Sequence, residues 1–116
     1  MSNLIDQKAL NAFVGDDQEM LDELTAVYGQ VLPSDLEQLN QASESGDCDR
    51  AAEIAQRFQG RFQCFSATRL TGLAQELRSL AEEERLSEAD ELVSDVCDGA
   101  LALLDELQAL TEQTQS

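Results

Sequence analysis

Apolar residues recur in this chain at intervals of three and four positions, the spacing that places side chains on one face of an α-helix. The clearest run comprises Ala51, Ile54, Ala55, Phe58, Phe62 and Phe65. Such runs are separated by turn residues, most clearly at Ser43-Glu44-Ser45-Gly46-Asp47. With one proline, six glycines and 42% apolar residues in 116 positions, the pattern predicts an all-helical chain with an apolar core, and it excludes a disordered one.

The longest expected helix begins at Asp16 and Asp17, whose carboxylates suit the positive end of a helix. Its apolar face is expected to consist of Met20, Leu24, Val27 and Val31, widened by Leu21, Tyr28 and Leu32. Leu36 and Leu39 continue the same spacing beyond Pro33, so we expect the proline to kink this helix without ending it. Alternatively, Ser34 and Asp35 begin a new helix.

A short helix is expected before this long one. Asp6 is a suitable N-terminal cap, and Leu10, Phe13 and Val14 supply an apolar side. Gly15 is expected to end the helix, because glycine readily adopts the left-handed conformation found at helix C-termini.

Three further helices are predicted from their caps and apolar faces. Asp47 or Asp49 caps the third helix, Thr68 the fourth and Ser87 the fifth. The apolar face of the fourth is expected to be Leu70, Leu73, Ala74, Leu77, Leu80 and Ala81. That of the fifth is expected to be Leu92, Val93, Val96, Ala100, Leu103, Leu107 and Leu110. The polar tail from Thr111 to Ser116 is expected to be frayed.

One short helix and four long ones, joined by short connections, favour antiparallel neighbours. The predicted fold is therefore all-α, an antiparallel up-down four-helix bundle with a short extra N-terminal helix. A chain of this length is expected to form one domain over residues 1–116, with its core at about 5–110. The alternative architecture is a dimer that completes a larger coiled-coil bundle.

The formal net charge of −17 argues against nucleic acid and anionic membranes as partners, since both bind clustered lysine and arginine. The N-terminal residues have neither the basic region nor the apolar run of a signal peptide. Cys48, Cys64 and Cys97 lack C-x-x-C spacing, and reduced thiols are their simplest interpretation. We therefore expect a cytoplasmic protein without a metal site or cofactor.

One segment departs from this acidic background. Between Ile54 and Gln75 the chain has three arginines, Arg57, Arg61 and Arg69, and no acidic residue, which gives a local charge of +3. One interpretation is a chance gap in an acidic protein. The functional interpretation is a docking surface for an acidic partner, because acidic residues are absent where they would repel it.

Helical geometry places a polar face within this segment. Three positions opposite the phenylalanine face point within about 40° of one direction: Gln56, Gly60 and Gln63. Gln59 flanks them on one side, and Arg57 and Arg61 form an i, i+4 pair on the other. Glycine inside a helix costs ~1 kcal/mol relative to alanine. Gly60 is therefore either merely tolerated at an exposed position or used to let a partner approach closely.

The pattern Ala55-x-x-Phe58-x-Gly60 resembles the bacterial histidine phosphotransfer (HPt) domain family. Gly15-Asp16-Asp17 and Gly46-Asp47 before two helices, and Leu70 and Leu77 in the fourth, also fit the family pattern. The resemblance covers roughly residues 5 to 108 and implies a four-helix bundle with a short N-terminal helix.

The resemblance also assigns roles to positions in the third helix. In the family, the position of Gln56 holds the phospho-accepting histidine, that of Gln59 usually holds lysine, and that of Arg61 usually holds a small residue. This chain has no histidine at all. A carboxamide nitrogen is a poor nucleophile, although Gln56 can still donate and accept hydrogen bonds. These departures indicate a degenerate member of the family.

The family's partners are receiver domains of response regulators and hybrid histidine kinases, whose phosphorylation pockets are acidic. The resemblance therefore implies a non-catalytic HPt-like signalling module that binds a receiver domain, or a related partner, without accepting phosphate. The expected partner-binding residues are Gln56, Arg57, Gln59, Gly60, Arg61 and Gln63.

A different possibility is a structural or oligomerisation bundle that does not bind receivers and uses the same face as a homodimer contact. An enzyme is disfavoured, because the chain has no histidine, no glycine-rich phosphate loop and no nucleophile beside a base. We expect a monomer or a weak homodimer.

Overall fold

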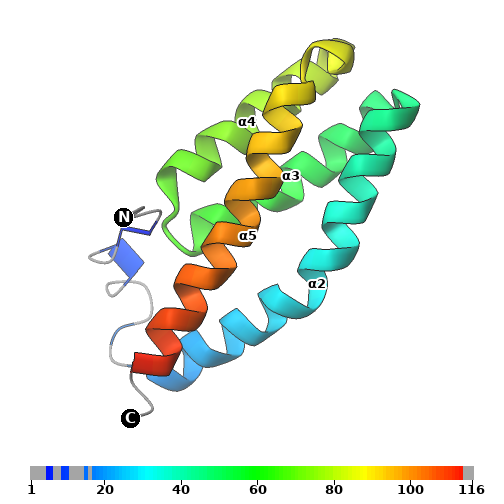
Figure 1. Cartoon of the computed structure of the whole chain (residues 1–116). Coiled ribbons are helices and arrows are strands. Elements are labelled where there is room, and N and C mark those ends of the chain that lie inside the picture. Colours follow the sequence, from blue (N-terminus) through cyan, green and yellow to red (C-terminus); the bar gives the residue numbers. More distant parts are fainter. Residues whose placement is uncertain (1–4, 7–8, 11–14, 16, 114–116) are drawn as a thin grey trace.

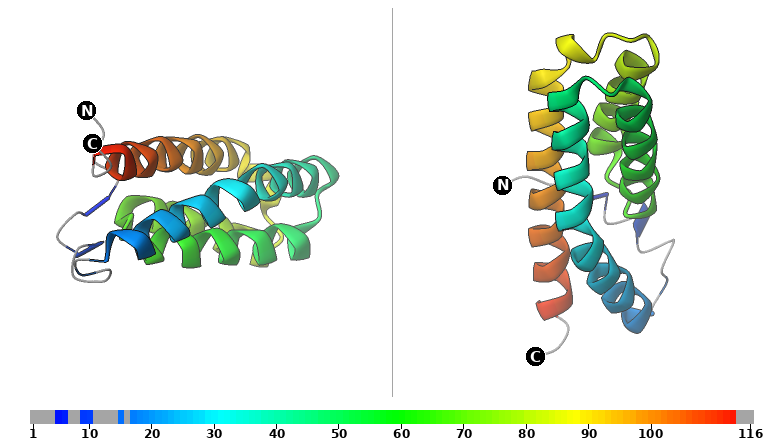
Figure 2. Two further views of the ribbon diagram at one scale, coloured as in Figure 1. Left: turned by 90° about the horizontal axis from the view of Figure 1, so that it is seen from below. Right: turned by 90° about the vertical axis from the view of Figure 1, so that its right-hand side faces the viewer.

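The computed structural model describes residues 5–6, 9–10, 15 and 17–113. Over these residues the chain is all-helical, as predicted, and contains four long α-helices (Figure 1). They are α2 (Gln18–Ser45), α3 (Cys48–Cys64), α4 (Thr68–Glu82) and α5 (Asp90–Gln113), with the 3-10 helix η1 (Leu86–Glu88) before α5. The four helices pack side by side as a bundle, with α2 next to α3 and α5 (Figures 1 and 2).

Two aspartates cap helices. The sequence predicts the cap of α3 and places acidic residues at the start of α2. The side chain of Asp17 accepts a hydrogen bond from the backbone N–H of Met20 at 3.0 Å, and Asp47 accepts one from Arg50 at 3.1 Å. Asp47, not Asp49, is therefore the cap of α3. Between α2 and α3, Gly46 adopts a φ of 72°, the left-handed conformation in which glycine avoids the strain of a side chain.

The predicted cap of α4 is wrong. Thr68 is already the first residue of the helix, and the cap position belongs to Ala67, which makes no side-chain hydrogen bond. Ala67 is fully buried, and its N–H donates to the carbonyl of Phe62 at 2.8 Å. Core packing of this alanine, and not a polar cap, determines where α4 begins.

The predicted cap of α5 is also wrong. Ser87 lies in η1, and α5 begins three residues later at Asp90. Leu86 and Ala89 are both buried, and the carbonyl of Ala89 accepts the hydrogen bond from the N–H of Val93 at 2.8 Å. Burying these two apolar residues requires an extra 3-10 turn, which displaces the start of the helix beyond the serine.

Helix α2 continues through Pro33. The alternative of a new helix at Ser34 is therefore wrong, and α2 changes direction along its length in both views of Figure 2. A proline removes one backbone hydrogen bond and crowds the preceding turn, which accounts for a bend without a break.

The apolar face predicted for α2 is confirmed only in part: Leu21, Tyr28 and Leu32, predicted to widen it, are buried, whereas its main stripe is one position out of register. The buried apolar residues of α2 are Leu21, Tyr28, Leu32, Leu39 and Ala42. Val27, which the prediction placed in the core, is 56% exposed, and Met20 and Leu24 are only partly buried. Of two adjacent stripes of apolar residues on α2, the one that contains Tyr28 faces the core.

The cores of the other helices match the prediction more closely. All six apolar positions predicted for α3 and its C-cap are buried, and the Phe58 and Phe62 rings stack with centroids 5.6 Å apart. Tyr28 of α2 meets Phe65 edge to face at 5.4 Å. On α4 and α5 most predicted positions are buried, and the partly buried exceptions are Leu73, Leu80, Leu92 and Leu110.

At the two ends of the chain the predictions can be compared only in part. The side chain of Asp6 accepts a hydrogen bond from the N–H of Ala9 at 3.2 Å, as a cap would, and Leu10 is buried. Phe13 and Val14 lie outside the described residues, as do positions 114–116 of the tail. Helix α5 continues to Gln113. None of the described helices is long and apolar enough to cross a membrane.

Candidate functional site

The polar face of α3 lies on the outside of the bundle. Gln56, Gly60 and Gln63 are exposed, whereas Phe58 and Phe62 on the opposite side are fully buried. The burial of the phenylalanine face against the rest of the bundle therefore fixes which side chains of α3 are presented to solvent.

Four of the six predicted partner-binding residues surround one shallow groove of about 540 Å³. Gln56, Arg57, Gly60 and Arg61 line it. Glu53 and Cys64 complete the lining, and sequence reasoning assigned neither of them to the site. Burial raises the pKa of the Cys64 thiol, so this cysteine stays protonated and is a weak nucleophile near neutral pH.

Gly60 leaves open space beside this groove. A Cβ atom built on Gly60 would meet no heavy atom within 4 Å outside its own helix backbone and chain neighbours. The glycine is therefore not needed for packing inside the protein. Its effect is to lower the surface between Gln56 and the two arginines, where a partner could approach the helix backbone.

The other two predicted residues do not line the groove. Gln63 is exposed on the same helix, beyond the groove. Gln59 is only partly exposed, and its carbonyl oxygen Oε1 is buried without a hydrogen-bond partner among the described residues. Gln59 therefore lies at the edge of the exposed face.

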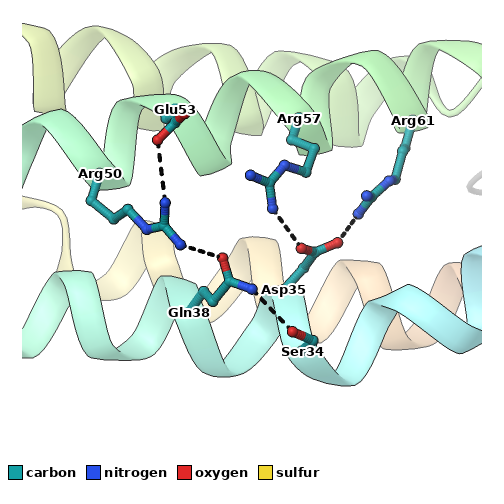
Figure 3. Close-up of polar contacts among 7 residues, drawn as sticks. All are labelled: Ser34, Asp35, Gln38, Arg50, Glu53, Arg57 and Arg61. Atoms are coloured by element: carbon teal, nitrogen blue, oxygen red, sulfur yellow. Dashed lines mark hydrogen bonds and ion pairs between the residues drawn. The ribbon is translucent and has the colours of Figure 1, made fainter.

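The two groove arginines are bound to a carboxylate of α2 that the sequence analysis did not single out for the site. Arg57 Nη1 lies 2.8 Å from Asp35 Oδ1, and Arg61 Nη1 contacts Asp35 Oδ2 (Figure 3). Asp35 itself is only 4% exposed. One buried carboxylate thus holds two guanidinium groups that lie one helical turn apart.

This contact changes the electrostatics expected from the sequence. Burying an ionised carboxylate is costly unless charged hydrogen-bond donors surround it, and here each oxygen has one arginine. The two arginines and Asp35 together carry +1. The groove is therefore less positive than the arginines alone suggest, and part of their charge stabilises the fold.

A sequence signal for Asp35 does exist. The buried positions of α2 recur with strict four-three spacing, at Leu21, Thr25, Tyr28, Leu32, Asp35, Leu39 and Ala42. Asp35 occupies a core position in this series, where a carboxylate requires a basic partner. The adjacent stripe of Met20 and Val27 competes with this series in the sequence and makes the core position of Asp35 harder to predict.

A second polar contact joins α2 and α3 near the other end of the groove. Arg50 Nη2 donates to Gln38 Oε1 at 2.7 Å, and Arg50 Nη1 lies 3.4 Å from Glu53 Oε2 (Figure 3). Gln38 in turn donates to the hydroxyl of Ser34 at 3.0 Å. The acidic residue of the groove is therefore already paired with an arginine.

No protein-family model, no curated protein and no solved structure matches this chain. The resemblance to HPt domains consequently depends on the sequence pattern described above.

Proposed function

We propose that this chain is a non-catalytic HPt-like signalling module of a bacterial two-component or phosphorelay system. It binds a receiver domain of a response regulator or hybrid histidine kinase, or a related signalling partner, without accepting phosphate. The observation that carries the proposal is the placement of Gln56, the position of the family's histidine, on a groove beside Gly60 and two arginines.

The arrangement of the helices supports the same proposal. The connections between α2 and α3 and between α3 and α4 are short, as in an antiparallel up-down bundle of one domain. In such a bundle, α3 presents its polar face to one side, as the HPt resemblance requires. The groove is polar and carries a small positive charge, which suits an acidic receiver pocket and disfavours nucleic acid or an anionic membrane.

Gln56 explains why binding would not lead to phosphotransfer. Its amide nitrogen is not nucleophilic at neutral pH, but the amide can hydrogen-bond where an imidazole would. A receiver could therefore dock and leave again with its phosphorylation state unchanged. Such a module acts in the cytoplasm as a scaffold or as a competitor of active phosphotransfer domains.

The sharpest test uses glycine variants, because Gly60 and Gly72 form a matched pair. Both are exposed helical positions, and a Cβ at either meets nothing within 4 Å. We expect Gly60→Glu to abolish receiver binding, because it places a carboxylate in the groove. Gly72→Glu makes the same chemical change on α4 and should bind like the native chain.

The measurement begins with capture from the native lysate on the native chain, Gly60→Glu and Gly72→Glu, followed by calorimetry with each purified receiver candidate. Receiver-domain proteins enriched on native and Gly72→Glu baits, but not on Gly60→Glu, are the expected result. Binding that is indifferent to Gly60→Glu would contradict the proposed surface. Reversing the charge of Arg57 and Arg61 is a poorer probe, because it would leave Asp35 buried against two further carboxylates.

A structural or oligomerisation role is the other candidate, and two exposed apolar side chains favour it. Val27 is 56% exposed and Leu101 is 48% exposed. Single exposed apolar residues are common on monomers, so this observation is weaker than the groove. Sedimentation of the native chain distinguishes the two functions: a stable dimer that dissociates on Val27→Glu or on Gly60→Glu would favour the oligomerisation role.

A further inference from the structure

The pair of groove arginines has hydrogen-bonding capacity beyond its contact with Asp35. Each guanidinium carries five N–H donors in a planar fork. In the described part of the chain, Arg57 and Arg61 each donate hydrogen bonds to the protein through the Nη1 atom alone. Their side chains remain 36% and 25% exposed and line the groove. Donors on two forks are therefore available to an acceptor that enters from solvent.

Asp35 holds these forks in place. An exposed arginine ordinarily loses much side-chain entropy when it binds a ligand. Here the buried carboxylate, 4% exposed, already restricts both arginines before any ligand arrives. By contrast, Arg78 and Arg85 pair with exposed carboxylates of nearby residues, Glu82 and Glu88, and those pairs restrict them less.

The local charge favours an oxyanion at the Arg57 and Arg61 end of the groove. The two arginines with Asp35 carry +1, and the groove's acidic residue, Glu53, is paired with Arg50. Gly60 lies between the two arginines in sequence, and a Cβ there would meet only open space. Because Gly60, Arg57 and Arg61 line the same groove, we expect a small tetrahedral anion to approach the free N–H donors through this open space.

From these contacts we propose that Arg57 and Arg61, positioned by Asp35, form a phosphoryl-binding site by which the module recognises the phosphorylated form of its receiver. This inference rests on the proposed function. A phosphoryl group offers three oxygens and up to two negative charges, so it satisfies two forks better than a carboxylate. No bond forms or breaks, since Gln56 does not take up the phosphoryl group.

The site itself is tested first with small anions. Inorganic phosphate and acetate are titrated at matched ionic strength into the ¹⁵N-labelled chain, and the Nε–H signals of its six arginines are followed by NMR. Phosphate should shift the signals of Arg57 and Arg61 more than that of Arg78, and acetate should shift them less. Equal shifts of all arginines, or equal effects of the two anions, would overturn the phosphoryl site.

The second test uses a receiver captured as described above, alone and with beryllium trifluoride and Mg²⁺ to mimic the phosphorylated aspartate. The loaded receiver should bind about tenfold more tightly, the effect of one added charged hydrogen bond. Arg57→Lys keeps the charge but loses the fork, so it should remove this difference. Arg78→Lys is the matched control and should keep it.

The outcomes separate the two proposals. If both receiver forms bind the native chain equally, the phosphoryl site is wrong and the receiver-binding function stands. If neither form binds, both proposals fail. If Arg57→Lys keeps the tenfold preference, the preference arises elsewhere on the surface and the assignment to these arginines is wrong. Thermal unfolding of Arg57→Lys confirms that the variant is folded during the measurement.

Discussion

Helix α2 is held to its two neighbours by different chemistry. Toward α3, buried Asp35 binds Arg57 and Arg61. Toward α5, the hydroxyl of Tyr28 donates to the carbonyl of Ala100 at 2.7 Å, and Gly29 lies beside the Leu104 side chain. The first interface places charged arginines at the surface, where a partner can contact them, whereas the Tyr28 and Gly29 contacts of the second involve only neutral groups. The difference predicts that changes at α2–α3 affect both stability and binding, and changes at α2–α5 affect stability alone.

The largest effect is expected for Arg57→Ala with Arg61→Ala. Removing both arginines leaves Asp35 buried without a charged partner, which should lower the free energy of unfolding by about 3–5 kcal/mol. Urea unfolding followed by circular dichroism measures the loss. The matched control, Arg78→Ala with Arg85→Ala, removes the same charge from exposed pairs and should cost much less. Equal losses in the two variants would mean that burial of Asp35 does not determine the stability of this interface.

At the α2–α5 interface, Tyr28→Phe should cost about 1 kcal/mol, the net value of one buried neutral hydrogen bond. The ring itself stays against Phe65, so packing is preserved. Urea unfolding again measures the change, and calorimetric titration with the receiver should give an unaltered affinity. Weaker receiver binding by this variant would contradict the division of roles between the two interfaces.

The same tyrosine predicts instability in alkali. Burial raises the pKa of Tyr28, and the charge of Arg61 only partly opposes this. The unfolded chain releases the phenolic proton near pH 10, while the folded chain retains it to higher pH. The contribution of Tyr28 is therefore complete below about pH 10 and is lost as the pH rises above it.

The tyrosinate absorbance of the native chain reports this titration without interference, because the sequence has one tyrosine and no tryptophan. We expect ionisation of the phenol to coincide with unfolding. Tyr28→Phe should lose less stability than the native chain between neutral pH and alkali. A phenol that ionises near its ordinary pKa in the folded protein would show that Tyr28 is accessible to solvent.

The helical content of this chain could be predicted because apolar spacing and turn residues act locally. The predicted face of α3 is buried, Asp47 caps α3 as expected, and α2 begins at the acidic residues where it was expected to begin. The starts of α4 and α5 were wrong because buried alanines at positions 67 and 89 occupy the capping positions in place of nearby hydroxyl residues. Capping preferences of single residues do not contain this information about packing between helices.

The candidate site was predicted only in part for a similar reason. Helical geometry was enough to bring Gln56, Arg57, Gly60 and Arg61 to one surface of α3. The carboxylate that holds the arginines comes from another helix, and the correct stripe of α2 had to be known before Asp35 could be placed in the core. Contacts between helices depend on register, and two similar apolar stripes on α2 left that register ambiguous.

The smallest predicted effects come from two glycines, one at the α2–α5 interface and one at the groove. A Cβ on Gly29 would lie 3.5 Å from Leu104 Cδ1, an ordinary contact, and a Cβ on Gly60 would meet nothing. Both positions are helical, so Gly29→Ala and Gly60→Ala should each raise the free energy of unfolding by about 0.5–1 kcal/mol. Their stabilities should therefore change together while their receiver affinities diverge. Only Gly60→Ala should weaken binding, because its methyl group fills the space that a partner would enter. Weaker binding by Gly29→Ala and not by Gly60→Ala would place the partner on the α2–α5 side of the bundle.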